Sequence, residues 1–472
     1  MNGFDASLRR PEAVRYALRL TEPQHDLLRA HLFPGDGNEA VALLLCGRRK
    51  GQSNHVFSVR TALPVPHAAC SVRTLDRITW PTTFVDDLLS EAYGKAQAVV
   101  KIHSHPGYYR RFSTTDDESD RVLFDSVSSL LGDNLPHASV VMLPDGEMFG
   151  RVLADGEVIQ PLSLITVTGS DLKLFGVQSG MSSDAFALRH AQAFGKGTTA
   201  LLRSLSIAVV GCSGTGSIVI EQLARLGVGR LVLIDPDRVE EKNLNRILNS
   251  GKKDAYLKRH KVRVLAAAIA RMGLGQEVLP LPLNLATREA VLAVAECDVV
   301  FGCMDGVEGR HLLNRLATFY SMPYFDVGVR LDADGKRGIS SIAGAVHYLQ
   351  PGRSSLLSRE VYTMKQVEAE ELKRTNPELY AEQRRAGYLR GVDEDRPAVI
   401  SINMLYASLA VNEFLARLHP YRNQSNGDYA YLGASLSEVG LYSEPESADC
   451  PALKRHVGRG DVEPLLERPT LS

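Results

Sequence analysis

The chain has 472 residues, enough for roughly two to four domains of ordinary size. It is 44% hydrophobic with a formal net charge of −1, so it can form buried cores, and its overall charge gives no reason to expect nucleic acid or a membrane as its main partner. The start, MNGFDASLRRPEAV, lacks the apolar core of a signal peptide, and no apolar run reaches the ~18 residues of a membrane span, so we expect a cytoplasmic protein.

Residues 1–165 are expected to form an α+β domain. A helix over TEPQHDLLRAHLF leads to the buried strand EAVALLLCG, which we expect to end at Gly47. A helix in PTTFVDDLLSEAYGKA precedes the strand AVVKIHSH, and a helix in DDESDRVLFDSVSSLLG precedes the strands ASVVMLP and EMFGRVL. Residues 166–184 are polar and rich in glycine and serine, and are expected to be a linker.

Residues 185–472 are expected to form an α/β, Rossmann-like domain with a parallel-rich sheet. The strands SIAVVG, RLVLID, EVLPLPL and DVVFGC alternate with helical patterns such as HKVRVLAAAIARM, which is typical of parallel strands joined by crossover helices. Residues 352–395 are charged and expected to be irregular, and AVISINMLYASLAVNEFLARL is expected to be a strongly apolar helix.

The stretch IHSHPGYYRRFSTTD places two histidines at the end of an apolar strand. Side chains two residues apart in a strand point to the same face, so His103 and His105 project together. The Ser-Thr-Thr-Asp that opens the next helix can bring Asp116 back onto them. Two imidazoles and a carboxylate form a zinc-binding set with a fourth position for water, whose pKa zinc lowers to about 7. Each half alone also has a simpler explanation, as a structural His-x-His pair and as a helix cap.

The combination of His-x-His-Pro, a spacer and Ser-x-x-Asp resembles the motif of the JAMM (MPN-type) zinc metalloproteases, over roughly the first 160 residues. The resemblance implies that His103, His105 and Asp116 bind zinc. Glu39 in EAVALLLCG matches the glutamate that the family carries on an earlier strand, and would pass a proton from water to the leaving amine. Ser113 would hydrogen-bond the oxyanion. Family members typically cleave after the C-terminal glycine of a ubiquitin-like protein.

The stretch SIAVVGCSGTGSIVIEQLARLG places Gly211, Gly214 and Gly216 between an apolar strand and a helix. Glycine there lets the backbone turn sharply and approach a phosphate, and the helix N-terminus favours negative charge. On the glycines alone, a nicotinamide dinucleotide fold fits as well, since Asp235 ends the next strand about where a ribose-binding acid belongs.

Charged residues further along favour a triphosphate over a dinucleotide. Arg246 and Lys261 would neutralise the phosphates, and Asp305 in DVVFGCMDG could hold magnesium. The order Asp-x-Asp, Asn-x-x-Arg, Lys, Asp resembles the ThiF-like adenylyltransferase domain of ubiquitin-activating enzymes and of the activators of the sulfur carriers of molybdopterin and thiamine synthesis, over about residues 185–420. The resemblance implies an ATP site with the ribose on Asp235, the phosphates on Asn243, Arg246 and Lys261, the metal on Asp305, and Asp237 in the same pocket.

The same resemblance implies a reaction and an assembly. A C-terminal glycine carboxylate would attack the α-phosphate of ATP, giving an acyl-adenylate and pyrophosphate, mainly by positioning and charge neutralisation. Arg189 matches an arginine that the family commonly supplies across a dimer interface, which implies a homodimer with two composite sites. Two departures are Ser213, where the family has a glycine, and the missing Cys-x-x-Cys pairs, so no structural zinc is expected in this half.

The chain has six widely spaced cysteines. Ubiquitin-activating enzymes pass the adenylated tail to a catalytic cysteine as a thioester, so each cysteine here is weighed for that role. Cys212 and Cys297 are expected to be structural. Cys450, in the polar SADCPALKRHVGRGD, is expected to be the most exposed and is the candidate thioester cysteine, with a leftover tail cysteine as the simpler interpretation.

The combined expectation is a bifunctional bacterial-type enzyme. It would cut after the C-terminal glycine of a ubiquitin-like protein, in maturation or deconjugation. It would also adenylate that tail with magnesium and ATP, and a ubiquitin-conjugating-type enzyme is a further expected partner. The alternatives are sulfur-carrier activation for cofactor or cysteine biosynthesis, a catalytically silent scaffold that binds such tails, and nicotinamide-dependent redox chemistry.

Overall fold

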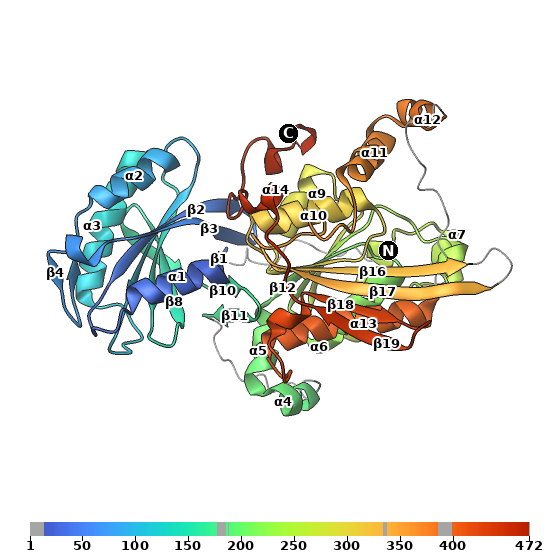
Figure 1. Ribbon diagram of the computed structural model, residues 1–472, viewed down its shortest axis with the longest axis horizontal. Helices are drawn as coiled ribbons and strands as arrows, with labels where there is room; N and C mark the ends of the chain where they lie inside the picture. Colours follow the sequence, from blue (N-terminus) through green and yellow to red (C-terminus); the bar gives the residue numbers. More distant parts are fainter. Residues whose placement is uncertain (1–13, 177–185, 187, 334–337, 386–398, 472) are drawn as a thin grey trace, which may run out of the picture. The chain divides into compact units, whose positions relative to one another are not determined.

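The structure is a computed structural model that describes residues 14–176, 186, 188–333, 338–385 and 399–471 (Figure 1). The chain divides into two compact units. The N-terminal unit extends to Thr166 and also includes Leu174–Gly176 and Gly458–Asp461. The C-terminal unit contains Val167–Lys173, Val177–Val457 and Val462–Ser472.

A mixed nine-stranded sheet, in the order β11-β10-β1-β3-β2-β6-β7-β8-β9, forms the centre of the N-terminal unit. Its strands are β1 (Arg15–Thr21), β2 (Val41–Lys50), β3 (Asn54–Pro64), β6 (Ala98–Ser104), β7 (His137–Met142), β8 (Met148–Ala154), β9 (Glu157–Pro161), β10 (Leu164–Thr168) and β11 (Leu172–Phe175). The short strands β4 (Val72–Arg73) and β5 (Ile78–Thr79) pair separately. The helices are α1 (Glu22–Leu32), α2 (Thr83–Ala92) and α3 (Thr114–Leu131).

The central strand β6 is buried along its whole length, because it pairs with β2 on one side and β7 on the other and is covered by helix. Val99 of β6, Leu88 of α2 and Phe124 of α3 belong to one hydrophobic cluster. α3 starts at the Ser113 cap and ends at Gly132, whose φ of 65° is the left-handed conformation that glycine adopts readily. The two histidines are thus placed at the end of a buried strand, next to a capped helix.

Two expectations for this half need correction. β2 does not end at Gly47 but continues to Lys50. The Gly47 N–H donates to the Gly458 carbonyl at 3.0 Å, and a side chain at Gly47 would collide with the backbone of Arg459, so glycine is required there by close packing. Residues 166–175 of the expected linker lie largely in β10 and β11, whose Leu164 and Leu172 are buried; residues 177–184 lie outside the described residues.

An eight-stranded sheet, in the order β14-β13-β12-β15-β16-β17-β18-β19, forms the centre of the C-terminal unit. Its strands are β12 (Ser206–Val210), β13 (Arg230–Ile234), β14 (Glu277–Leu281), β15 (Val299–Gly302), β16 (Tyr324–Ala333), β17 (Ile339–Leu349), β18 (Tyr431–Ser435) and β19 (Gly440–Glu444). The first five in this order are parallel, and β16 to β19 pair antiparallel. The parallel half confirms the predicted Rossmann-like fold, and the antiparallel half is an addition that the sequence pattern did not indicate.

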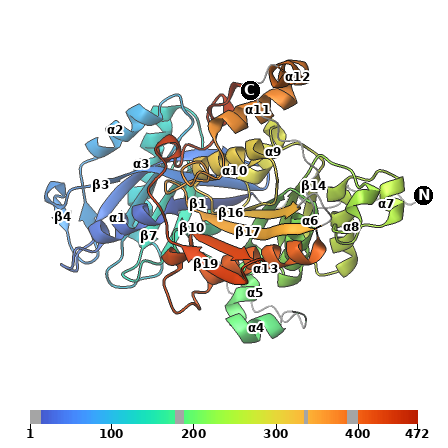
Figure 2. The same ribbon diagram turned by 45° about the vertical axis from the view of Figure 1, so that its right-hand side comes forward.

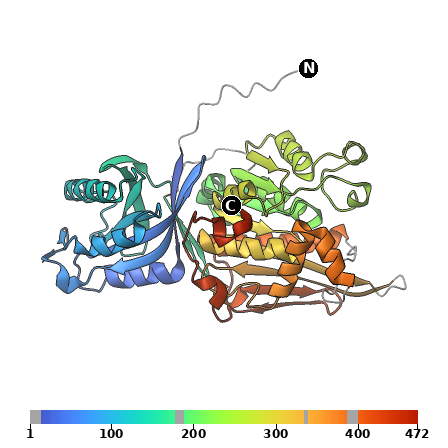
Figure 3. The ribbon, with the colours of Figure 1, turned by 90° about the horizontal axis from the view of Figure 1, so that it is seen from above.

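Helices cover both faces of this sheet. One face carries α6 (Gly214–Leu226), α8 (Lys261–Met272) and α13 (Ile400–Leu418), and the other carries α9 (Arg288–Ala295) and α10 (Val307–Phe319) (Figure 1). The remaining helices are α4 (Leu188–Phe194), α5 (Lys196–Ser204), α7 (Lys252–Tyr256), α11 (Met364–Thr375), α12 (Pro377–Arg385) and α14 (Pro451–Lys454). The long pair β16 and β17 is the most extended part of the sheet (Figure 3).

The expectation of an irregular segment over residues 352–395 is wrong for its middle part, which forms α11 and α12. Thr363 caps α11 by accepting from the Gln366 N–H, and Val367 is buried in the core. The high charge of this segment reflects two solvent-facing helices; residues 386–395 lie outside the described residues. Across the residues that the structure describes, no helix combines the length and the apolar character that crossing a bilayer requires.

Candidate functional site

The spacing of β6 and α3 aligns two strand residues with two helix residues. Lys101 and His103 are two apart on one face of β6, a step of about 6.6 Å, and Asp120 and Asp116 are four apart on α3, a rise of about 6 Å. Lys101 accordingly pairs with Asp120, and the His103 Nε2 lies 2.9 Å from the Asp116 Oδ1. Because the two-residue step along β6 and the four-residue rise along α3 are nearly equal, Asp116 lies next to the histidines.

His103, His105 and Asp116 form one compact cluster. Their candidate ligand atoms all lie within 4.8 Å of one another, and the two Nε2 atoms are 3.1 Å apart. The His105 Nδ1 lies 2.7 Å from the Tyr109 carbonyl, which holds a proton on Nδ1, so the neutral imidazole directs its Nε2 lone pair into the cluster. The structure therefore brings together the three residues expected to bind metal, two of them buried.

The electrostatics of the cluster favour an anionic carboxylate between imidazoles. Burial alone would raise the pKa of Asp116, but its hydrogen bonds with His103 and His105 hold that pKa well below its usual range. Burial lowers the pKa of His103. The pKa of His105 is raised, because Asp116 and the Tyr109 carbonyl outweigh the effect of burial.

Glu39 lies beside this cluster, just before the start of β2 rather than within a strand. In the antiparallel register of β2 and β6, Val41 is opposite His103, and continuing the register places Glu39 opposite His105. The Ser104 N–H donates to the Ala40 carbonyl at 3.0 Å, which keeps the register past the strand end. Burial raises the pKa of Glu39 to about 7, with His105 opposing and Asp116 adding to the rise, a value suited to proton transfer near neutral pH.

Ser113 caps α3. Its hydroxyl donates to the Asp116 Oδ2 at 2.7 Å and accepts from the Asp116 N–H at 3.1 Å. The helix-cap interpretation of Ser-x-x-Asp therefore describes real contacts, and the same contacts orient the carboxylate toward the histidines.

A buried ion-pair network behind the cluster was not predicted from the sequence. Asp120 is fully buried and receives hydrogen bonds from Arg151 at 2.7 and 3.1 Å in addition to its pair with Lys101. Arg151 also pairs with Asp117 and lies over the Phe112 ring, 3.9 Å from its centre. The available signal was a lysine two residues before the first histidine and an aspartate four residues after Asp116.

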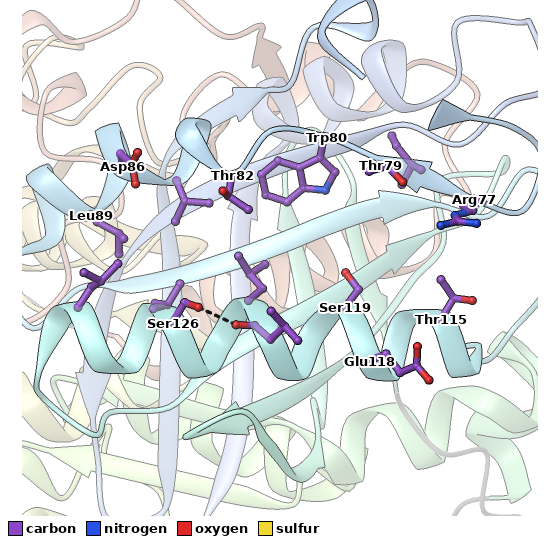
Figure 4. A pocket seen from close by; sticks show the side chains of 16 residues that line it. Arg77, Thr79, Trp80, Thr82, Asp86, Leu89, Thr115, Glu118, Ser119 and Ser126 are labelled. Atoms are coloured by element: carbon purple, nitrogen blue, oxygen red, sulfur yellow. Dashed lines mark hydrogen bonds between the residues drawn. The ribbon is translucent and has the colours of Figure 1, made fainter. Parts of the chain in front are cut away.

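A cavity of about 510 Å³ lies between α3 and the segment that leads into α2. Figure 4 shows Trp80 and Thr82 facing Ser119 and Ser126 of α3 across it. Thr115, the residue before Asp116, also lines it. The apolar positions of the two amphipathic helices form its inner wall, and no motif in the sequence indicated it.

A second cavity, of about 490 Å³, lies at the carboxyl ends of β12, β13 and β15 in the C-terminal unit, where open α/β sheets bind ligands. It gathers residues that are far apart in the sequence. Seven residues predicted for the ATP site line this cavity: Gly211, Asp235, Asp237, Asn243, Arg246, Lys261 and Asp305.

The glycines make this edge of the sheet accessible. Gly211 has a φ of 90°, where a residue with a side chain is strained, and a Cβ there would lie 2.5 Å from the Cys303 carbonyl oxygen. Gly214 and Gly216 begin α6 behind the lining, and side chains there would collide with Asn403 and with the Gly211 carbonyl. Ser213 precedes α6 and lines the cavity, with an ordinary negative φ of −96° but a ψ of −141° that lies outside the usual strand and helix regions.

Lys261 lies between two carboxylates. Its Nζ is 2.7 Å from the Asp237 Oδ2 and 3.8 Å from the Asp235 Oδ1. Asp235 also accepts from the Cys212 and Asp237 N–H groups, at 2.7 and 2.8 Å. Burial raises the pKa of Asp235, against the lowering effect of Lys261. In this state the Lys261 ammonium is therefore engaged by carboxylates of the pocket.

The remaining lining residues hold the surrounding loops. Asn243 is buried and its Oδ1 accepts from the Glu240 N–H at 3.1 Å, which caps a short 3₁₀ turn. Arg246 donates to the Lys242 carbonyl at 2.9 Å. Glu370 of α11, which the sequence analysis missed, lines the cavity and accepts from the Glu308 N–H at the start of α10 at 2.9 Å.

Besides Gly214 and Gly216, the predicted residues Arg189 and Cys450 lie outside the nucleotide cavity. Arg189 is exposed on α4 and does not line the cavity of its own chain, so its role across a dimer stays a prediction. The expected exposure of Cys450 is wrong, because its side chain is 1% exposed and its N–H donates to the Arg353 carbonyl at 3.0 Å. Cys212 and Cys297 are buried as expected, and Cys70 and Cys303 are partly buried.

Comparison with known proteins gives two family matches, the ThiF family over residues 187–450 and prokaryotic homologues of the JAB domain over residues 21–152. Among similar curated proteins, "Ubiquitin-like modifier-activating enzyme 5" of Culex quinquefasciatus is 27% identical over 166 residues, 33% of this chain and 39% of that protein. "Adenylyltransferase and sulfurtransferase MOCS3" of Mus musculus is 38% identical over 122 residues, 26% of each chain. The chain thus spans about two fifths or less of the length of these relatives.

Among solved structures, "Crystal structure of E. coli MccB + ATP" is 18% identical with a TM-score of 0.43, covering 58% of this chain and 75% of that one. The ThiF match covers more than half of the chain and includes the whole nucleotide cavity. The JAB match includes the histidine cluster and Glu39. The chain belongs to the ThiF family, and it joins its ThiF region to an N-terminal homologue of the JAB domain.

Proposed function

We propose that the chain processes and activates the C-terminal glycine tail of a ubiquitin-like protein. The C-terminal unit would adenylate the tail with Mg-ATP, and the N-terminal unit would hydrolyse the bond after the same glycine. The observation that carries this proposal is the convergence, in one chain, of a His-His-Asp cluster beside a buried glutamate and of a charged cavity at the carboxyl edge of a ThiF-type sheet. A cytoplasmic setting, which supplies ATP, belongs to the same proposal.

The donor set of the cluster suits zinc. Two Nε2 atoms and the Asp116 carboxylate converge at 2.9 to 3.6 Å, and the His105 Nδ1 is committed to a carbonyl, so the neutral imidazoles and the carboxylate would offer three ligands to one ion. His103, His105 and Asp116 would hold the ion, which when bound supplies Lewis acidity toward water and the scissile carbonyl.

The protein's own side chains would perform the proton transfers of hydrolysis. Glu39, whose pKa burial raises to about 7, would accept a proton from the attacking water and deliver it to the leaving amine. Ser113 would stabilise the oxyanion. Its hydroxyl now donates to Asp116, so it must turn away from that carboxylate to do so.

For adenylation, the cavity would orient ATP and the tail carboxylate. Asp235 would bind the ribose, Asn243, Arg246 and Lys261 the phosphates, and Asp305 the magnesium. Lys261 would exchange its contact with Asp237 for the phosphates, which transfers a cation already desolvated in the pocket to the new anion. Arg189 of a second protomer would complete the site in a homodimer, and a conjugating enzyme would receive the activated tail.

The experiment that tests this proposal uses ubiquitin-like proteins ending in glycine, each supplied mature and with a C-terminal extension. Intact-protein mass spectrometry should show a tail adenylate from the mature form with ATP and magnesium, and loss of the extension on zinc-loaded protein. A panel that gives neither product, with the protein folded and zinc bound, would contradict the proposal.

Sulfur-carrier activation is the second candidate, favoured by the similarity to a protein named for both adenylyl transfer and sulfur transfer. It shares the adenylate and differs in the next step. A thiocarboxylate that forms only when a sulfide source is added would support it, and a thioester or isopeptide product would support conjugation.

A further inference from the structure

A third cavity, of about 580 Å³, lies in the C-terminal unit and is lined by the loop after β13, the α7 region and α8. Figure 2 shows where the α7 and α8 ribbons lie. Six cationic side chains line it against a single carboxylate, that of Asp254; they are Arg238, Lys253, Lys258, Arg259, Arg263 and Arg271. In a chain with a net charge of −1, this is a strong local concentration of positive charge.

The geometry of α8 keeps this charge in a hollow. Arg263, Ala267 and Arg271 are spaced four residues apart, so they form one stripe along the helix. The small Ala267 leaves space between the two guanidinium groups. Both arginines are exposed, whereas Val264 beneath them belongs to a small hydrophobic cluster with Val239 and Ala255. The packing of Val264 against this cluster thus fixes the orientation of α8, with Arg263 and Arg271 on its exposed side.

Internal ion pairs do not neutralise the cavity. Asp254 is already engaged, by Arg259 at 3.0 Å and by the Gly251 N–H at 3.0 Å. Arg238 donates to the Lys258 carbonyl at 2.7 Å. Among the described residues, no carboxylate pairs with Lys253, Arg263 or Arg271, and the buried His260 Nδ1 has no hydrogen-bond partner.

The cavity shares a wall with the nucleotide cavity. Arg238 and His260 form an antiparallel bridge, flanked by hydrogen bonds from the Val239 N–H to the Arg259 carbonyl at 2.8 Å and from the Lys261 N–H to the Asp237 carbonyl at 3.0 Å. Asp237 and Lys261 line the nucleotide cavity, whereas Arg238 and His260 line the basic one. Alternate residues of one two-stranded wall therefore serve two different cavities.

We propose that this basic cavity is a second anion-binding site that takes the phosphates of a multiply charged ligand, held mainly by Arg263 and Arg271. One carboxylate could not balance this many cations, and guanidinium groups match phosphate oxygens in pairs. The phosphates can come from a free polyphosphate or from the backbone of single-stranded nucleic acid. This inference does not depend on the proposed function.

The test measures anisotropy of a short fluorescein-labelled oligoribonucleotide bound to the full chain at several salt concentrations, with inorganic tripolyphosphate and poly-glutamate as competitors. The R263Q/R271Q double variant should weaken binding at least about tenfold and reduce the salt slope by about two, since two phosphate contacts are lost. R263K/R271K should retain most of the affinity. R121Q/R225Q removes the same charge from exposed arginines on α3 and α6 and should bind as the unchanged protein does.

Competition separates the two sources of phosphate. Displacement by tripolyphosphate at comparable concentration supports a free polyphosphate, and displacement only by unlabelled oligonucleotide supports nucleic acid. The proposal is overturned if nothing binds, if R263Q/R271Q binds as R121Q/R225Q does, or if poly-glutamate competes as well as the phosphates. It is also overturned if only Lys261→Ala abolishes binding, because the phosphates would then occupy the nucleotide cavity.

Discussion

The histidine cluster draws its three ligand atoms from one strand end and the first turn of the following helix, between His103 and Asp116. The nucleotide cavity instead gathers residues from Val210 to Glu370. In the cluster two imidazoles surround one carboxylate, whereas in the cavity Lys261 lies between Asp235 and Asp237. Under the proposed function, the first site would be preformed for a metal ion, whereas the second would have to exchange internal ion pairs for its substrate.

Replacing the proton acceptor should have the largest effect and should affect only one of the two sites. Glu39→Gln should lower tail cleavage by about 10²–10⁴-fold, since an amide cannot accept the proton, while zinc content and adenylation stay unchanged. Cleavage of an extended ubiquitin-like protein and metal analysis would measure this. Glu157→Gln, at an exposed position on β9, is the control and should cleave normally. Equal cleavage by the two variants would refute the role of Glu39.

Breaking the network behind the cluster should destabilise the N-terminal unit. Asp120→Asn leaves Lys101 and Arg151 buried without their shared counter-charge, which should cost about 3 kcal/mol or more of unfolding free energy. Asp125→Asn, exposed on the same helix, should cost little. Urea unfolding of both variants measures the difference, and a similar loss in both would rule out the network as the cause.

The same network gives a pH dependence. Burial alone would raise the pKa of Asp120, but Lys101, Ser139 and Arg151 hold it below the ordinary 3.8. A lowered carboxyl pKa contributes stability above the unfolded value, and this contribution is lost as pH falls below about 3.8 toward the folded value. Unfolding free energy should therefore fall less steeply with acid in Asp120→Asn than in the unchanged protein; parallel pH profiles would contradict this.

Removing the Lys261 ammonium from the nucleotide cavity should disable the other reaction. Lys261→Ala should lower ATP–pyrophosphate exchange by about 10²-fold or more, because it leaves Asp235 and Asp237 to repel the phosphates, while tail cleavage is retained. Lys365→Ala, exposed on α11, is the matched control. Normal exchange in Lys261→Ala would show that the cavity binds its substrate by other contacts.

The smallest effect is expected at Cys450. Its side chain is 1% exposed, so Cys450→Ser should change adenylation by less than about twofold and leave any thioester intact. Iodoacetamide should label the partly exposed Cys70 before Cys450 in the folded protein. Loss of a thioester in Cys450→Ser, with adenylation retained, would instead identify Cys450 as the thioester cysteine.

The sequence predicted what local pattern and spacing determine. Apolar runs located the parallel strands and α13, and the two-residue step between His103 and His105 predicted a shared face that the structure contains. Seven of the residues predicted for ATP line one cavity, because the carboxyl ends of parallel strands meet at one edge. These features depend on periods and topology that the sequence carries directly.

What the sequence did not predict depends on tertiary partners. Cys450 lies among polar neighbours, and only its backbone contact with Arg353 and its packing show that it is buried. Gly47 has no turn signal; its role is visible only in the approach of Gly458 and Arg459. Lys101 looks like a polar residue in a strand until Asp120 is placed beside it by the matching steps of strand and helix.

One measurement tests most directly whether the two sites act in sequence on one tail. ATP–pyrophosphate exchange would be followed with a ubiquitin-like protein that is either mature or extended beyond its glycine, using the unchanged protein and Glu39→Gln. We predict exchange with the mature form in both proteins, and exchange with the extended form only when Glu39 is present. Exchange with the extended form in Glu39→Gln, or failure of the mature form in both proteins, would contradict the account.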